Sequence, residues 1–269
     1  MSTKPATSPN RLLAALPAKE RDRFLADCTL ENLPFGTVLY EQGEPMRHVY
    51  FPTECFISML TTVDRRSTLE VGMIGDEGMC GYALNLGGNV SSLRALVQGP
   101  GRAWRMKAAT FSRHLENMPT LRRILGRYVH VILGQLSQSA ACLRFHVVEK
   151  RLARWLLMTQ DRAHTDSFGV TQEFLAFMLG VRRVGVTKAA GILQSRKLIR
   201  YRRGHMTILS RKRLEAAACA CYQTDLDTYE YGMAAAVAAH RRKREPQMRR
   251  IPQKKVRLQR QAQLREEET

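Results

Sequence analysis

The chain has 269 residues, of which 44% are hydrophobic, so it can bury a core in one large domain or two modest ones. Lys and Arg number 43 against 24 Asp and Glu, which gives a net charge of +19. A surplus of this size attracts polyanions, of which nucleic acid is the commonest and an anionic membrane surface the second. The composition excludes a disordered chain and favours a folded protein that binds nucleic acid.

The N-terminus and the cysteines indicate the expected compartment. Residues 1–10 are polar, contain two prolines and lack the apolar region of a signal peptide. The longest uncharged stretch, residues 128–143, is too short and too polar to span a bilayer, so no membrane partner is predicted. The six cysteines are scattered, at positions 28, 55, 80, 142, 219 and 221. Reduced thiols in a cytoplasmic protein are therefore expected.

The first 106 residues change from helical to strand periodicity. Residues 10–25 carry leucines and a phenylalanine at helical spacing, which predicts a short amphipathic helix. Short runs of β-branched and aromatic residues follow, separated by turns that contain Gly, Pro or Asp; they are residues 37–40, 48–51, 55–60 and 69–74. Several short strands at regular spacing predict a sandwich or barrel, which ends near residues 103–106.

Helical periodicity returns at Ala108, and Pro119 can begin a new helix because proline is tolerated in the first turn. Apolar residues then recur at alternating four- and three-residue steps for about three heptads, as in a coiled coil. The seam consists of Leu125, Val129, Ile132, Leu136 and Leu143, with Ser139 in its one polar position. Two interpretations stay open: a dimerisation helix that also packs on the barrel, or an ordinary core helix of a monomer.

Residues 171–193 have the pattern of a helix-turn-helix. A helix is expected at residues 147–159, followed by a polar loop at 161–169. Thr171 can cap the next helix, and Gly180 permits a tight turn after it. The second helix has a small, apolar inner side formed by Val186, Ala189, Ala190 and Leu193. Its start and its opposite side are basic, as in a recognition helix that enters the major groove.

Arginine at the start of such a helix matches the O6 and N7 atoms of guanine, and an apolar side chain matches the methyl group of thymine. Residues 198–203 and 206–209 alternate like strands around Gly204, which predicts a hairpin, or wing, along the phosphate backbone. The predicted DNA-binding residues are Thr171, Arg182, Arg183, Val184, Lys188, Arg202, Arg203 and His205. Any one of these cations alone would be read as a solvated charge; their ordered arrangement favours DNA binding.

These features resemble the Crp/Fnr family of bacterial transcription regulators. Residues 171–199 resemble its winged helix-turn-helix, and residues 34–44, Pro-Phe-Gly-Thr-Val-Leu-Tyr-Glu-Gln-Gly-Glu, resemble the opening strands of a cyclic-nucleotide-binding barrel. The resemblance covers about residues 11–225 and implies an α+β fold: a jelly-roll-like double-stranded β-helix as sensor barrel, a long dimerisation helix and a C-terminal winged helix-turn-helix. It also implies a homodimer on double-stranded DNA with two-fold-related half-sites, and RNA polymerase is a further candidate partner.

The expected organisation has five parts. They are a disordered N-terminus at 1–10, the sensor barrel at 11–118, the dimerisation helix at 119–144, the DNA-binding domain at 145–230 and a basic, disordered tail at 231–269. From Arg241 onward, eleven basic residues stand against four acidic ones. The tail is either solvated or adds non-specific phosphate contacts.

The sequence departs from the family where an effector would bind. Cyclic-nucleotide binders carry Gly-Glu for the ribose and a downstream arginine for the cyclic phosphate. The matching positions here are Gly81-Tyr82 and the segment that contains Ser91, Ser92 and Arg94, and these five residues form the candidate effector pocket. Because tyrosine cannot replace the carboxylate, cyclic AMP is not the expected effector.

No cofactor, metal or catalytic site is predicted. An iron–sulfur cluster needs about four thiolates, and the one close pair, Cys219 and Cys221, has no second pair or histidine beside it in the sequence. The chain lacks a nucleophile elbow, a P-loop and a metal-binding His/Glu helix motif, so it is not expected to be an enzyme. The alternative function is a barrel-containing signalling or scaffold protein that binds DNA or RNA non-specifically through its basic surface and tail.

Overall fold

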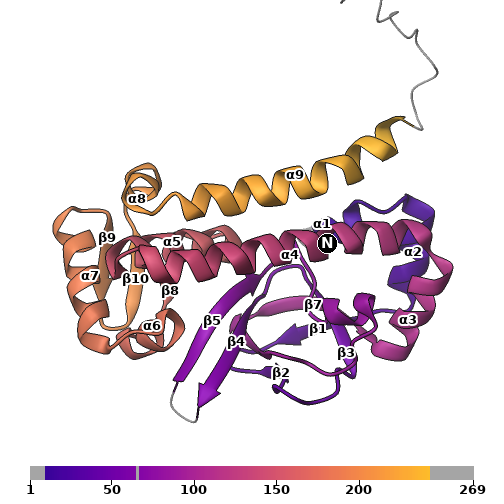
Figure 1. The fold of residues 1–269 in the computed structure, drawn as a ribbon, viewed down its shortest axis with the longest axis horizontal. Helices are drawn as coiled ribbons and strands as arrows, with labels where there is room; N and C mark the ends of the chain where they lie inside the picture. The colour runs from indigo at the N-terminus through magenta and orange to yellow at the C-terminus, as the bar shows by residue number, and fades with distance from the viewer. Residues whose placement is uncertain (1–9, 65–66, 243–269) are drawn as a thin grey trace, which may run out of the picture. The chain divides into compact units, whose positions relative to one another are not determined.

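Two antiparallel sheets form the N-terminal barrel (Figure 1). The computed structural model describes residues 10–64 and 67–242, apart from the side chains at 64, 67 and 235–242. One sheet has the order β1 (Thr29–Leu33), β7 (Gly101–Lys107), β3 (His48–Pro52). The other has the order β2 (Val38–Tyr40), β6 (Arg94–Gly99), β4 (Phe56–Asp64), β5 (Ser67–Ile74). Side chains of both sheets fill one core, including Leu33, Tyr50, Ile57 and Val97.

The four strand runs expected from the sequence correspond to β2, β3, β4 and β5. Two further strands, β1 and β6, were not predicted. In β1 the polar Thr29, Glu31 and Asn32 interrupt the apolar pattern, so the strand depends on its pairing with β7. The second, β6, pairs with both β2 and β4 and begins at Arg94.

The single helix expected at residues 10–25 is two helices, α1 (Arg11–Ala14) and α2 (Ala18–Ala26). Pro17 lacks an N–H group and restricts the residue before it, so the chain turns there and Pro17 becomes the N-cap of α2. Asn10 is buried and ties α1 to the barrel. Its Oδ1 accepts hydrogen bonds from the first turn of α1, and its Nδ2 donates to the carbonyl oxygens of Pro52 and Gly78.

A 3-10 helix, η1 (Tyr82–Leu86), lies within the barrel segment, and α3 (Ala108–Asn117) follows β7. The long helix α4 (Pro119–Phe145) has Pro119 in its first turn, as predicted. Its buried side, which includes Ile124 and Tyr128, joins Phe51 and Met106 of the barrel in one apolar cluster. Helix α9 (Cys221–Arg242) runs alongside α4 (Figure 1).

The C-terminal domain begins at α5 (Val148–Ala163). It continues through β8 (Ser167–Gly169), α6 (Gln172–Leu179), α7 (Arg183–Ser195), β9 (Ile199–Arg202), β10 (His205–Ile208) and α8 (Arg211–Ala217). The loop expected at 161–169 contains β8, which pairs with β10 as a third strand beside the hairpin. The boundary expected after residue 230 falls inside α9, because the alanine-rich segment continues the helix to Arg242. The rest of the predicted tail, and residues 1–9, lie outside the described residues.

The barrel and the C-terminal domain share one apolar core. Phe56, Leu60 and Met73 of β4 and β5 pack with Leu156 and Leu179 of the C-terminal domain. The barrel therefore contacts the C-terminal domain directly. No helix in the described ranges is apolar over enough length to cross a bilayer.

Candidate nucleic-acid interface

Helix α6 begins and ends as the sequence predicts. The hydroxyl oxygen of Thr171 accepts a hydrogen bond from the Phe174 N–H at 3.1 Å, which caps the N-terminus. Gly180 ends the helix with φ +61°, in the left-handed region that favours glycine. A Cβ atom at this position would also come within 2.8 Å of Leu69 on β5. Gly180 therefore allows both the turn and its close approach to the barrel.

Helix α7 divides into a buried side and an exposed side. Val186, Ala189, Ala190 and Leu193 are buried, which confirms the predicted inner side. Arg182, Arg183, Val184 and Lys188 are exposed. Among the ion pairs of the described residues, none involves Arg182, Arg183 or Lys188. These three cations are therefore available for an anionic partner.

The hairpin expected after α7 is present. Strands β9 and β10 are antiparallel, with Arg202 opposite His205. The two turn residues, Arg203 and Gly204, have φ of 50° and 74°, as in the type I′ turn that suits a two-residue hairpin loop. Arg202, Arg203 and His205 are exposed at the tip. The wing therefore presents basic side chains on the surface.

The wing is anchored by Tyr201 of β9, beside the tip pair of Arg202 and His205. The hydroxyl of Tyr201 donates a hydrogen bond to the carbonyl oxygen of Val170 at 2.9 Å. Its backbone N–H donates to Oε1 of Gln194, the residue before the last of α7, at 2.7 Å. The wing and α7 therefore hold a fixed relative position.

The residues of the predicted effector pocket are held in separate local contacts. Gly81 precedes η1 with φ +95°, and the ring of Tyr82 contacts that of Tyr128 edge-on, with centroids 6.4 Å apart. The Ser91 hydroxyl is buried and donates to the carbonyl oxygen of Leu93 at 2.6 Å, whereas Ser92 is exposed. The guanidinium Nε of Arg94 lies 3.3 Å from a carboxylate oxygen of Glu41.

The cavity beside Tyr82 is small. It lies between β5 and α4, is lined in part by Leu93, Ile132 and Leu136, and has a volume of about 20 Å³. That is room for about one water molecule. Ligand sites for molecules of drug size are usually about 300–1,000 Å³. This cavity therefore cannot hold a nucleotide in the present conformation.

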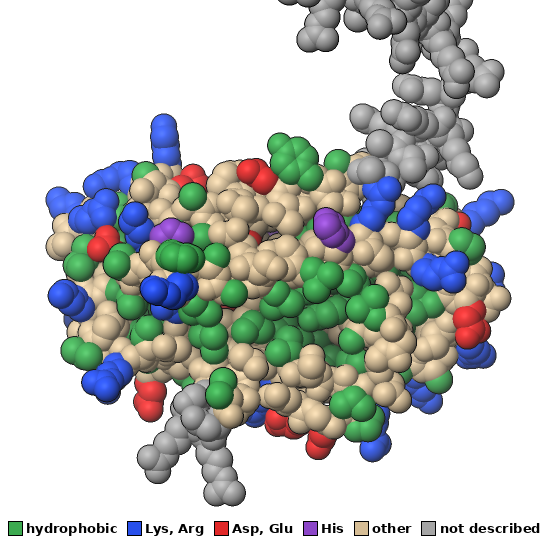
Figure 2. Space-filling model, in the orientation of Figure 1, with side chains coloured by type: hydrophobic (Ala, Val, Ile, Leu, Met, Phe, Trp, Pro, Cys, Tyr) green, Lys and Arg blue, Asp and Glu red, His purple; other side chains and the backbone are tan. Residues whose placement is uncertain are grey.

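The predicted dimer seam is divided between the interior and the surface. Leu125, Val129 and Ile132 keep at most 9% of their surface exposed, and Leu125 and Ile132 pack in one cluster with residues of the barrel and α9. Leu136 and Leu143 remain partly exposed, and Leu133, outside the predicted seam, is 57% exposed. Figure 2 shows an apolar area in the middle of this face. Partly buried Val71, Tyr82, Leu93 and Leu136 belong to the adjoining clusters.

The close cysteine pair has partners that the sequence analysis missed. Cys142 and His146 lie beside Cys219 and Cys221. The signal was the four-residue spacing of Cys142 and His146, which puts both on one side of a helix end. The distance along the chain between the two pairs concealed their proximity.

Comparison with known proteins identifies the C-terminal domain and the fold. Residues 150–217 match the Crp-like helix-turn-helix domain family. Similar solved structures include the c-di-GMP responsive global regulator CLP of Xanthomonas campestris. The match has 17% identity, covers 72% of this chain and 100% of that chain, and has a TM-score of 0.61. FixK2 of Bradyrhizobium japonicum has 15% identity over 71% of this chain and 98% of that chain, with a TM-score of 0.61.

A Crp-family transcriptional regulator of Thermus thermophilus has 16% identity over 70% of this chain and 96% of that chain, with a TM-score of 0.58. No curated protein sequence matches the chain. The matched family is a DNA-binding domain, in agreement with the expectation that the chain is not an enzyme. Residues 150–217 therefore belong to the Crp-like helix-turn-helix domain family, and the chain shares the fold of CLP, FixK2 and the Crp-family regulator.

Proposed function

We propose that the chain acts as a homodimer on a two-fold-related DNA site, with one α7 helix in the major groove of each half-site. The observation that carries this proposal is the surface of α7: three cations without ion-pair partners among the described residues surround its first turns, while its other side is buried. In a helix-turn-helix, the N-terminal residues of the second helix contact base edges.

The residue types on α7 indicate which contacts to expect. Arg182 and Arg183 stand at the start of the helix, where a guanidinium can donate two hydrogen bonds to one guanine. Val184 is 72% exposed, and its apolar side chain suits a thymine methyl group. Lys188 lies one turn further along, within reach of a base or a phosphate. Arg202, Arg203 and His205 of the wing would contact phosphates and fix the register.

The proposed dimer uses the outer side of α4. Gly126, His130, Leu133, Ser137 and Ala140 are solvent-facing and follow the alternating four- and three-residue steps of a coiled coil. The small residues in this stripe allow a partner helix to approach closely, and Leu133 would become buried. Leu136 and Leu143 flank the stripe and would contribute the exposed part of the predicted seam.

We also propose that the effector is not cyclic AMP. Tyr82 replaces the carboxylate that would bind a ribose, and Arg94 is paired with Glu41. The space beside Tyr82 has a volume of about 20 Å³. Opening it for a nucleotide would require α4 to separate from β5.

In-vitro selection of DNA by the purified full chain, with and without cyclic AMP, tests this function. We expect an enriched inverted repeat with half-sites about one DNA turn apart, the same in both conditions. Arg183→Ala and Lys188→Ala should weaken binding to it, whereas Lys212→Ala, which removes an exposed charge on α8, should not. Salt-sensitive binding without enrichment would favour the non-specific alternative, and dependence on cyclic AMP would overturn the effector proposal.

A further inference from the structure

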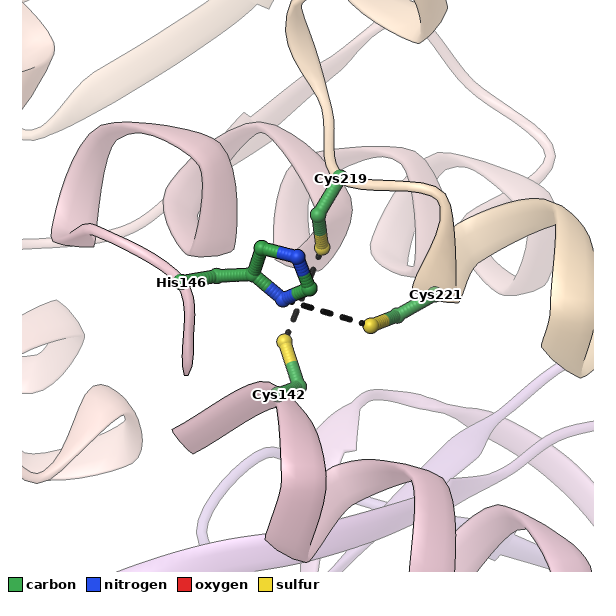
Figure 3. A group of neighbouring side chains, drawn as sticks. All are labelled: Cys142, His146, Cys219 and Cys221. Atoms are coloured by element: carbon green, nitrogen blue, oxygen red, sulfur yellow. Dashed lines mark hydrogen bonds between the residues drawn. The ribbon is translucent and has the colours of Figure 1, made fainter. Parts of the chain in front are cut away.

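Four potential metal ligands meet where α4 ends and α9 begins (Figure 3). Cys142 is in the last turn of α4 and His146 follows its end, while Cys219 and Cys221 lie at the start of α9. The three thiols and the imidazole point toward one another, and their ligand atoms all lie within 4.8 Å. The Sγ atoms of Cys142 and Cys219 are 3.6 Å apart, and Sγ of Cys221 is 3.4 Å from Nδ1 of His146.

These distances match the edges of a tetrahedral site. With zinc–sulfur bonds of about 2.3 Å and zinc–nitrogen bonds of about 2.0 Å, two sulfurs are separated by about 3.8 Å and a sulfur and a nitrogen by about 3.5 Å. The observed separations agree with these values to a few tenths of an ångström. A two-iron cluster would place the ligands of opposite irons further apart than 4.8 Å, because both metal ions lie between them.

We propose that Cys142, His146, Cys219 and Cys221 bind one Zn²⁺ ion in a closed structural site. Thiolate and imidazole ligands in tetrahedral geometry select zinc over the hard cations, which prefer oxygen. All three cysteines are at most 4% exposed, and four protein ligands leave no open position on the metal. The site would therefore hold the chain together without catalysing a reaction.

The surroundings of the cluster suit a bound metal. The Nε2 atom of Gln138 donates a hydrogen bond to Sγ of Cys221 at 2.9 Å, an outer contact of the kind that orients a metal ligand. Three thiolates and one Zn²⁺ carry a net charge of −1. Arg151 lines the same small pocket as Cys142 and would offset that charge, whereas Arg154 is already paired with Asp225.

The packing argues against ordinary buried cysteines. Cys142, Cys219 and Cys221 form a buried cluster of their own, which no aliphatic or aromatic side chain among the described residues joins. Small residues placed only to fill space would be expected inside one of the larger clusters. Here the thiols gather around one imidazole, so what they share is the ability to bind a metal.

The position of the four ligands in the fold indicates what a bound metal ion would do. Residues 146 and 147 connect α4 to α5, which opens the DNA-binding domain, and α9 leaves that domain at its other end. One ion held by Cys142 and His146 on one side and Cys219 and Cys221 on the other would join both connections. Zinc would thus fix the orientation of the helix-turn-helix relative to α4.

The metal content of the full chain, purified with reduced thiols, tests the proposal directly. We expect one zinc per chain by mass spectrometry. Replacement by Co²⁺ should give the thiolate-to-cobalt absorption and the intense visible bands of a tetrahedral site. Cys142→Ser and Cys219→Ser should each abolish these bands, whereas Cys55→Ser, a buried cysteine of the barrel core, should keep them.

Measurements on the unmodified chain keep the test decisive if a ligand variant fails to fold. A strong chelator should release one zinc and make three further thiols reactive. Gln138→Ala should weaken zinc binding by roughly 10-fold, and Gln223→Ala, which changes an exposed glutamine on α9, should not. The proposal would be overturned by reduced protein that carries no bound metal, by iron with sulfide, by a Cys142–Cys219 disulfide, or by zinc retained in both ligand variants.

Discussion

The indole Nε1 of Trp155 donates a hydrogen bond to Oε1 of Glu70 over 3.0 Å, and this contact joins α5 to strand β5. The other carboxylate oxygen of Glu70 accepts a hydrogen bond from the hydroxyl of Ser58 at 2.6 Å. Burial between the two domains raises the pKa of Glu70 from 4.5 to about 7, although both hydrogen bonds act to lower it. The contact between the barrel and the DNA-binding domain is thus sensitive to protonation.

Stability should fall as pH rises from about 5 to about 7. In this window the folded protein keeps a proton on Glu70 that the unfolded chain, with a pKa near 4.5, releases. Glu70→Gln resembles the protonated acid, so its stability should lack the pH-dependent fall caused by Glu70. At pH 8 the variant should therefore be more stable than the parent. The difference should be at most about 3 kcal/mol, and less where water reaches the side chain.

Urea unfolding of both proteins at several pH values measures the effect. Glu44→Gln, an exposed carboxylate of the barrel, provides the control and should follow the parent curve. Parallel curves for the parent and Glu70→Gln between pH 5 and pH 7 would show that Glu70 does not titrate as described.

We expect α7 to recognise bases and the wing to contact phosphates, so variants of the two elements should affect DNA binding in different ways. Arg183→Ala should cost about 1–3 kcal/mol on the selected site and relax specificity at one base pair. Arg203→Asn removes a charge while keeping a residue that tolerates the positive φ of the turn. It should weaken binding to all sequences and reduce the salt slope by about 1. Anisotropy titrations at several salt concentrations, on the site and its single-base variants, distinguish the two effects.

Dimer formation should depend on Leu133. The side chain is 57% exposed in the single chain, so Leu133→Glu should fold normally. In the proposed dimer the two carboxylates would be desolvated near each other, which opposes association. Light scattering should show the parent as a dimer and the variant as a monomer. Leu209→Glu, which changes a leucine that is 46% exposed after the wing, should remain dimeric; a dimeric Leu133→Glu would refute this interface.

The packing of α9 against α4 should depend on the absence of a side chain at Gly232. A Cβ atom there would lie 2.4 Å from Cγ2 of Val131, a fully buried, β-branched residue of α4 that cannot move aside easily. Gly232→Ala should therefore destabilise the protein by about 1–3 kcal/mol, despite the better helix propensity of alanine. Gly191→Ala on α7 meets no atom within 4 Å and should be neutral or stabilising. Thermal unfolding of both variants provides the comparison, and equal melting temperatures would contradict the close packing.

The helix-turn-helix was predictable because its determinants are local. The inner side of α7 follows from the spacing of Val186, Ala189 and Leu193 within one helix, and the turn follows from Gly180. Each lies within a few residues of the structure that it specifies. The same holds for the wing, where strand alternation and Gly204 specify the hairpin.

Other features depended on partners that are distant in the sequence. Strands β1 and β8 are short, and their own residue patterns do not predict strands. They form because they pair with β7 and β10. The apolar side of α4 indicates that Leu125 and Val129 are buried, but a barrel and a second chain satisfy the same periodicity equally well.

The sequence by itself determined the DNA-binding domain and the barrel-like N-terminal half, because helical and strand periodicity are properties of neighbouring residues. Tertiary structure decided which side of α4 is buried, placed Arg94 beside Glu41 and brought Cys142 to Cys219, 77 residues away. The physical reason is that burial and ligand geometry depend on distances in space, and the chain sets those distances only once its domains have packed together.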